Sequence, residues 1–216
     1  MQSPRTKSTS AFTLIELLVT IACVLVTVAI FLPSLARSKA RSSRLGCTNS
    51  LKQIGLGFRT WALDNDDHLP MQVSVTNGGT MELVASGLVF PHFRVMSNEL
   101  STPKILVCPN DKNRTYATNF DRDLKDAKLS YFINVDAVEG NGSSLLCGDR
   151  NLRNQAPAGS RFVCLSSSSV IGWTREMHWE KGYLCFADGS VNGFLNGAVG
   201  LTVRLRAGVT NRLAVP

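Results

Sequence analysis

His178 and Asp188 are the two side chains of this sequence whose types and spacing most resemble a catalytic or metal-binding pair. The stretch HWEKGYLCFADGSVNGF places nine residues between His178 and the dipeptide Asp188-Gly189. A histidine can act as a general base that a carboxylate orients, and the two side chains can also bind a metal ion together. Either chemistry requires the two groups to be close in space.

The predicted local structure keeps these two side chains apart. Lys181-Gly182 and Asp188-Gly189 are both turn signals, which predicts three antiparallel strands at about Arg175–Trp179, Tyr183–Ala187 and Ser190–Phe194. In the simplest register His178 lies opposite Leu184, and Asp188 lies roughly 13 Å away at about 3.3 Å per residue. The sequence therefore favours a structural role for both, a histidine at a strand end and a hairpin turn at Asp188-Gly189.

A second group of polar side chains lies earlier in the chain, in DNDDH, where Asp64, Asp66 and Asp67 precede His68. The carboxylates could offer oxygen ligands to Ca²⁺, but the spaced ligands and the terminal Glu of an EF-hand loop are lacking. This pattern is typical of a solvated turn that ends a helix. The run Ser166 to Ser169 has no GxSxG context, and no Gly-rich phosphate loop occurs. We therefore expect no enzyme activity, no metal and no cofactor.

Cysteine is frequent in this sequence, with six residues and no CxxC pair. Cys23 lies inside an apolar run. The five others are Cys47, Cys108, Cys147, Cys164 and Cys185. They allow two disulfides and one free thiol, or several buried free thiols, and the sequence leaves both alternatives open.

Length and charge restrict the classes of protein further. A chain of 216 residues suits one compact domain with an appendage. The formal net charge of +7 includes a cluster at Arg37, Lys39, Arg41 and Arg44. No aromatic residue interleaves with this cluster, so a nucleic-acid partner is not predicted.

The segment from Phe12 to Leu32 is uncharged except for Glu16 and is long enough to span a bilayer as a helix. Arg5 and Lys7 precede it, as in a signal or signal-anchor segment. A carboxylate at mid-membrane costs about 2.5 to 3.5 kcal/mol, and less near the edge. Glu16 therefore requires a functional explanation.

The residues around Glu16 supply a functional explanation for this carboxylate. AFTLIELL resembles the prepilin-type cleavage and methylation signal of type IV pilins and type II secretion pseudopilins. The resemblance implies that prepilin peptidase cuts between Ala11 and Phe12 and N-methylates Phe12. Ala11 stands where the family usually has Gly, and we expect this small residue to be tolerated. Pro33 falls where many pilins carry a helix-bending proline.

The same resemblance implies how the protein assembles. The new amine of Phe12 would pair with Glu16 of a neighbouring subunit, since either charge left unpaired in a low dielectric is strongly penalised. The implied partners are prepilin peptidase, other pilin or pseudopilin subunits, an inner-membrane assembly platform and the lipid bilayer.

The resemblance also implies the position of the chain in a bacterial cell. It would be a single-pass inner-membrane protein with a cytoplasmic N-terminus and a periplasmic C-terminal domain. The four basic residues after the span would by themselves favour the opposite orientation. The pilin resemblance and the cysteine content outweigh them.

Beyond Pro33 the helical pattern resumes. Its apolar residues, spaced four, three, four and three apart, are Cys47, Leu51, Ile54, Phe58 and Trp61. We predict a helix from Phe12 to about Leu63 and four parts of the chain: a leader 1–11, a transmembrane and assembly helix 12–33, an amphipathic helix 34–63 and an extracytoplasmic head 64–216. The fold class is α+β and pilin-like, a long helix on a small antiparallel sheet.

A second resemblance concerns this helix and the C-terminal motif. Cys-x-Asn-x-Leu-Lys-Gln-Ile-Gly-Leu from Cys47 to Leu56, together with His178 and Asp188-Gly189, resembles the H-X9-DG prepilin-associated family of Planctomycetes and Verrucomicrobia. The Cys-Pro-Asn-Asp segment at Cys108 is also similar to that family. The role of its histidine is not implied by the resemblance.

Three further elements are predicted. Lys104–Cys108 and Ser130–Val135 are expected to be strands. The tail is expected to form a short helix near Ala198–Arg206, with an edge strand at Leu201–Leu205 as the alternative.

Three functions fit these patterns. The favoured one is a structural subunit of a type II secretion pseudopilus or a type IV pilus-like filament. The alternative is a membrane-anchored extracytoplasmic binding module that carries a prepilin signal and does not polymerise. A third is an anchored hydrolase or metal enzyme that uses His178, His68 or the acidic turn.

Overall fold

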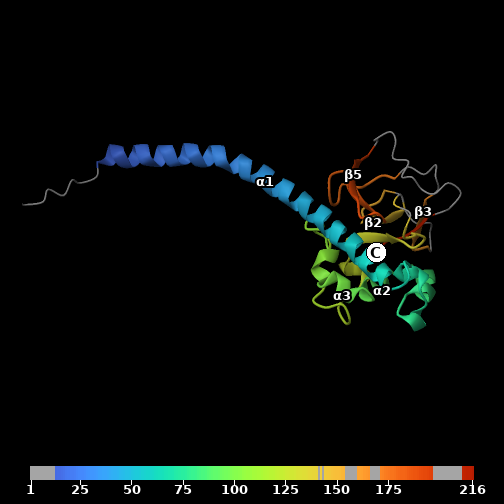
Figure 1. Ribbon diagram of the computed structural model, residues 1–216. Coiled ribbons are helices and arrows are strands. Elements are labelled where there is room, and N and C mark those ends of the chain that lie inside the picture. The colour runs from blue at the N-terminus through green and yellow to red at the C-terminus, as the bar shows by residue number, and fades with distance from the viewer. Residues whose placement is uncertain (1–12, 141, 143, 154–159, 166–170, 197–210) are drawn as a thin grey trace, which may run out of the picture. The chain divides into compact units, whose positions relative to one another are not determined.

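The computed structural model describes residues 13–140, 142, 144–153, 160–165, 171–196 and 211–216 (Figure 1). The chain forms two compact units, Met1–Ser42 and Ser43–Pro216, and each is described by itself. The predicted tail helix at Ala198–Arg206, and its strand alternative, lie outside the described residues.

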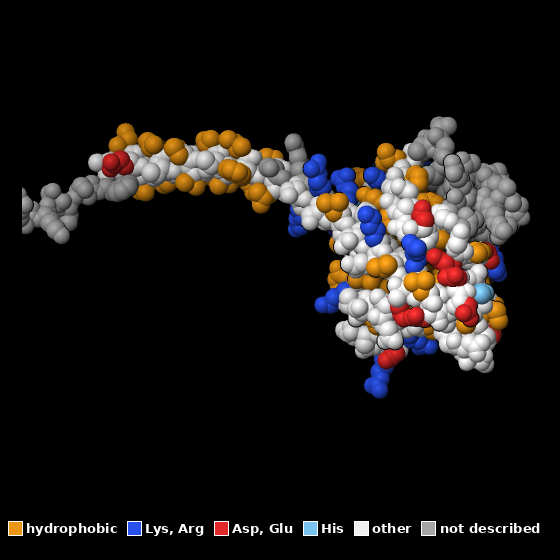
Figure 2. All heavy atoms as spheres, in the orientation of Figure 1, with side chains coloured by type: hydrophobic (Ala, Val, Ile, Leu, Met, Phe, Trp, Pro, Cys, Tyr) orange, Lys and Arg blue, Asp and Glu red, His pale blue; other side chains and the backbone are white. Residues whose placement is uncertain are grey.

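The described part of the first unit contains the beginning of helix α1, which runs from Leu14 to Leu63. Its segment Leu14–Pro33 is long and apolar enough to cross a membrane. Pro33 lies inside the helix and does not end it. In Figure 2, hydrophobic side chains cover this first part of α1, and Lys and Arg side chains gather where it ends.

The second unit begins with the remainder of α1, whose face from Cys47 to Trp61 is buried as the spacing predicts. The apolar residues of this face share one core with residues of the sheet, including Tyr131, Ile133 and Cys185. The helix residues are Cys47, Leu51, Ile54, Phe58 and Trp61. Because apolar side chains recur every three or four residues, they form one stripe along the helix. Packing of that stripe holds the helix against the sheet.

Short helical segments connect α1 to the first strand. They are η1 (Pro70–Gln72), η2 (Val75–Asn77), η3 (Met81–Ser86), α2 (Phe90–Arg94), α3 (Ser97–Leu100), η4 (Pro103–Leu106) and η5 (Asp126–Lys128).

The strand predicted at Lys104–Cys108 is wrong, because η4 occupies most of this segment. Pro103 starts a helical turn, and the Thr102 side chain accepts a hydrogen bond from the Lys104 backbone N–H. Leu106 still enters the core, where its carbonyl accepts from Ser130 N–H.

The six strands of the described residues form one sheet in the order β3-β6-β1-β2-β4-β5. Their bounds are β1 (Tyr131–Asn134), β2 (Leu145–Asp149), β3 (Phe162–Leu165), β4 (Lys181–Phe186), β5 (Val191–Leu195) and β6 (Asn211–Ala214). All described neighbours pair antiparallel. A helical segment followed by an antiparallel sheet makes the chain α+β, as predicted.

Alternation along the strands gives the sheet two apolar faces. In β1, Tyr131 and Ile133 belong to the core that contains α1, whereas Phe132 belongs to a second core with Trp173 and Leu213. Successive side chains of a strand point to opposite faces, which explains this division. The strand predicted at Ser130–Val135 is confirmed as β1.

The predicted three-stranded meander is wrong in its first strand. Residues 175–179 form bends and turns, and Lys181-Gly182 begins β4 instead of making a turn. The change of direction is made by Trp179 and Glu180, whose φ angles are 53° and 62°. β4 pairs with β5 on one side, as predicted, but its other neighbour is β2.

Candidate functional site: the His178 cluster and the N-terminal segment

The N-terminal segment carries the residues of the predicted assembly site. Ala11 and Phe12, the predicted cleavage and methylation positions, lie outside the described residues. Glu16 and Pro33 are both exposed. No side chain of Leu14–Pro33 is buried, so this apolar surface has no cover within the described part of the chain.

Glu16 stabilises the start of α1. Its Oε2 accepts hydrogen bonds from the Thr13 backbone N–H at 2.9 Å and from the Thr13 hydroxyl at 2.8 Å. The Glu16 N–H in turn donates to Thr13 Oγ1 at 3.4 Å. This reciprocal pattern of a Thr and a Glu three residues apart is a capping box, which satisfies N–H groups that the first helical turn leaves without partners.

A disulfide joins Cys47 of α1 to Cys108, which follows η4. The two cysteines are 61 residues apart in the chain. In the chain-entropy model, closing a loop of that length stabilises the folded state by about 4 kcal/mol. Cys147 and Cys185 are buried thiols, and Cys164 and Cys23 are exposed thiols.

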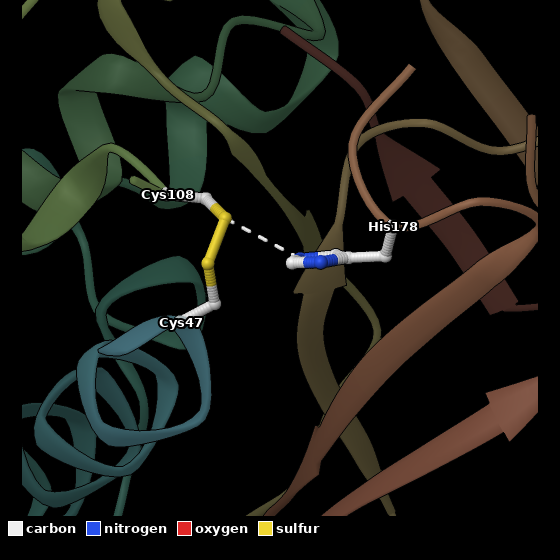
Figure 3. A group of neighbouring side chains, drawn as sticks. All are labelled: Cys47, Cys108 and His178. Carbon is white, nitrogen blue, oxygen red and sulfur yellow. Dashed lines mark hydrogen bonds between the residues drawn. A yellow bond between two sulfur atoms is a disulfide. The ribbon is translucent and has the colours of Figure 1, made fainter. Parts of the chain in front are cut away.

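His178 lies against this disulfide (Figure 3). Its Nε2 is 3.3 Å from Cys108 Sγ and 3.6 Å from Asp149 Oδ2. Its Nδ1 is 3.1 Å from the Asn110 amide nitrogen, which can only donate, so we assign the imidazole proton to Nε2. The ring also meets Tyr183 edge to face, with centroids 5.2 Å apart.

Burial decides the charge of this cluster. The side chains of His178 and Asp149 are both fully buried. Burial lowers the pKa of His178 to about 4, and the positive charges of Arg44 and Lys181 act in the same direction. Burial raises the pKa of Asp149 to about 8. At pH 7 the uncharged forms of both groups therefore predominate, and their contact is mainly one between neutral groups.

The donor set around His178 resembles a metal site but is not available as one. Cys47, Cys108 and His178 each offer a ligand atom, and these atoms lie within 4.8 Å of one another. Sulfur and imidazole ligands are typical of Zn²⁺ sites, but zinc requires thiolates. Both sulfurs are bonded to each other in this structure.

An ion pair next to the cluster ties the same segments together. Asp111 accepts from Arg150 Nε at 2.7 Å and Nη2 at 2.9 Å, and from the Ser130 hydroxyl at 2.8 Å. Burial opposes ionisation of Asp111, but the bonds from Arg150 and Ser130 outweigh it and hold the pKa of Asp111 below its usual range. Asp111 is therefore ionised at neutral pH.

The structure separates His178 from Asp188. His178 precedes β4, while Asp188 follows it in an exposed turn, where Asp188 Oδ1 accepts from Ser190 N–H at 2.7 Å. Gly189 there has a φ of 81°, which glycine adopts without strain. A six-residue strand between them corresponds to about 20 Å. The motif thus contributes to two different places, the core and a hairpin tip.

His68 and the acidic turn stay outside the cluster. His68 is exposed, and its Nδ1 lies 2.7 Å from the Asp66 carbonyl oxygen. Asp66 and Asp67 have φ angles of 53° and 58°, so they form a tight turn after α1.

Sequence reasoning missed Asn110, Asp149 and Arg150 as members of this site. Asn110 belongs to the Cys-Pro-Asn-Asp segment, and Asp149 ends an otherwise apolar strand, LLCGD. An acidic residue that ends a buried strand is a signal that could have drawn attention to Asp149. Its contact with His178 depends on the sheet.

Three comparisons with known proteins give no relative for this chain. No family model, no curated protein and no solved structure matches it.

Proposed function

We propose that this chain is a prepilin-like structural subunit. Prepilin peptidase would cut it between Ala11 and Phe12 and methylate Phe12, and the mature chain would assemble into a type II secretion pseudopilus or a type IV pilus-like filament. The single observation that carries the proposal is the combination of an apolar helix with no buried residue, Leu14–Pro33, with one carboxylate, Glu16, at its start.

The exposed apolar helix needs a cover. Large side chains such as Leu14, Ile21 and Phe31 are between 52% and 80% exposed. Apolar surface of this extent is stable only against lipid or other apolar helices. In the proposal, lipid covers the segment before assembly, and the same segments of neighbouring subunits cover it in the filament.

The capping box gives Glu16 a geometry suited to a second partner. Both hydrogen bonds from Thr13 go to Oε2. We assign Oε1 to the methylated amine of Phe12 from a neighbouring subunit. Such a pair would fix the register between subunits, because a carboxylate and an amine in a low dielectric are each costly without the other.

The second unit supports a pilin-like head outside the cytoplasm. Its long helix lies on an antiparallel sheet, which is the arrangement that the pilin resemblance implies. The Cys47–Cys108 disulfide favours an oxidising compartment such as the periplasm. The proposed orientation therefore has the N-terminus in the cytoplasm and the head in the periplasm.

Two substitutions of Glu16 separate capping from charge pairing. Glutamine can replace glutamate in a capping box, whereas alanine cannot. Glu16→Gln should therefore keep the start of α1 but lose the pairing with an amine, and Glu16→Ala should lose both. Each variant is expressed as the full chain with a prepilin peptidase, and intact mass establishes whether it begins at N-methylated Phe12.

Assembly is then measured by chemical crosslinking in membranes. We expect ladders of multimers from the wild-type chain and from the control Glu82→Gln, which alters an exposed glutamate of the head. Both Glu16 variants should give monomers. Wild-type ladders from Glu16→Gln would refute the charge pair, and a cleaved wild-type chain without ladders would favour the anchored binding module.

A further inference from the structure

Cys147 and Cys185 occupy facing positions on neighbouring strands. Cys147 lies in β2 and Cys185 in β4, and the two are direct partners in the antiparallel register. Direct partners in such a pair have Cα atoms about 4.5 to 5.5 Å apart. That range falls within the roughly 4.4 to 6.8 Å that a disulfide requires. The register, which is irregular between Leu145 and Cys147, therefore places the two backbones within reach of a bridge.

The two thiols also share one face of the sheet. Both side chains are fully buried and belong to the core that contains α1. A Cβ at Gly55 of α1 would lie 2.7 Å from Cys185 Sγ, so the helix leaves room for this sulfur only because residue 55 has no side chain. The helix restricts the sulfur of Cys185 to the space between α1 and β4.

Burial makes Cys147 a poor nucleophile once the protein has folded. Burial raises the pKa of Cys147 well above its usual range, and the neighbouring Cys185 thiol raises it further. Because the thiolate is the reactive form, a folded chain should react slowly with an oxidant. Bond formation must therefore precede closure of α1 over the sheet.

We propose that Cys147 and Cys185 form a second disulfide, in addition to Cys47–Cys108, which joins β2 to β4 during folding outside the cytoplasm. The oxidant would be a disulfide, either of a thiol oxidoreductase or of a small molecule. One thiolate attacks a sulfur of that disulfide and releases a thiol, and the second thiolate then displaces the other half. Two cysteine thiols are oxidised to one S–S bond, and the oxidant is reduced to two thiols that take up the two protons.

This inference rests on the proposed position of the head outside the cytoplasm, and the Cys47–Cys108 bridge reports on that position independently. Full-length protein is extracted from membranes, alkylated in denaturant without reduction, digested and analysed by mass spectrometry. We expect Cys164 to be alkylated and two crosslinked peptide pairs, Cys47 with Cys108 and Cys147 with Cys185.

Two other results have different meanings. Alkylated Cys147 and Cys185 in molecules that retain the Cys47–Cys108 bridge would overturn the inference and leave the proposed location intact. If Cys47 and Cys108 were alkylated too, the oxidising location would be refuted. The pairing would then be decided by refolding the reduced full chain in detergent with a glutathione redox buffer, where free Cys147 and Cys185 would overturn it.

The matched variants are Cys185→Ser and Cys164→Ser. In Cys185→Ser, Cys147 should become fully alkylated while the Cys47–Cys108 peptide pair persists. In Cys164→Ser, both peptide pairs should persist, since Cys164 is an exposed thiol on another strand. A Cys147–Cys164 bridge in the wild-type chain would contradict the assigned partner.

Discussion

Replacement of His178 by alanine should destabilise the head through packing. The imidazole is fully buried, accepts a hydrogen bond from Asn110 and contacts Cys108, Asp149 and Tyr183. The variant loses the hydrogen bonds with Asn110 and with Cys108 Sγ, leaves the Asn110 amide without its acceptor and opens a cavity. Together these effects should cost about 2 to 4 kcal/mol. For a unit of this size the midpoint of thermal unfolding should fall by about 5 to 15 °C.

The assay is thermal unfolding of the full chain in detergent micelles, followed by near-ultraviolet circular dichroism with the disulfide intact. His68→Ala is the matched control, because His68 is exposed. Its free energy of unfolding should change by less than about 0.5 kcal/mol. An unfolding midpoint of His178→Ala equal to that of the wild type would refute the packing role. The imidazole would then be expected to act in binding or chemistry.

Three more perturbations test the same unit by the same assay. Asp111→Ala leaves the buried guanidinium of Arg150 with the half-exposed Glu176 as its remaining carboxylate partner, so it should cost less than the roughly 3 to 5 kcal/mol of a buried charge left unpaired, and Asp111→Asn should cost less again. Gly182→Ala should cost at least about 1 to 3 kcal/mol, because its Cβ would lie 1.7 Å from Trp173 Nε1. A midpoint within about 2 °C of wild type, roughly 0.5 to 1 kcal/mol, would contradict that contact. Burial raises the pKa of Asp149 to about 8, so wild-type stability should fall as pH rises from about 4 to 8 through this group. Asp149→Asn should flatten that fall, and an unchanged slope would show that Asp149 ionises normally in the folded protein.

Through the buried histidines, the stability of the head should instead fall as the pH is lowered. Burial lowers the pKa values of His92 and His178 to about 4, so their neutral forms stabilise the fold above pH 6.5. This contribution is lost as pH falls toward 4. His178→Gln should therefore reduce the acid sensitivity of unfolding, and an equal sensitivity would assign the effect to other groups.

Local signals in the sequence predicted the helical part of the fold. The spacing of Cys47, Leu51, Ile54, Phe58 and Trp61 predicted a buried helix face, and the structure confirms it. The apolar run after Glu16 predicted a segment able to span a membrane. Both depend on a period of 3.6 residues or on an uninterrupted run, and neither needs a distant partner.

Strand positions were predicted less well than the helix. β1 was found from its run of strand-forming residues and β5 from the turn signal Asp188-Gly189 before it, but Lys104–Cys108 became a helical turn through Pro103 and Thr102. Lys181-Gly182 has the composition of a turn, yet it belongs to β4. Pairing with β5, in which Lys181 lies opposite Leu195 and Gly182 opposite Phe194, outweighs local propensity there, because strand stability depends on the neighbouring strand.

The composition of the candidate site was decided by tertiary structure. The sequence identified Cys47, Cys108 and His178 as separate motif residues and placed His178 opposite Leu184, whereas the fold brings it to the sulfur of Cys108, 70 residues before it in the chain. Asp149 reaches the same place because β2 lies beside β4. The sequence by itself determined which side chains can be buried along a helix or a strand. Which of them meet depends on the order of strands in the sheet, because that order is fixed by packing both faces of the sheet at once.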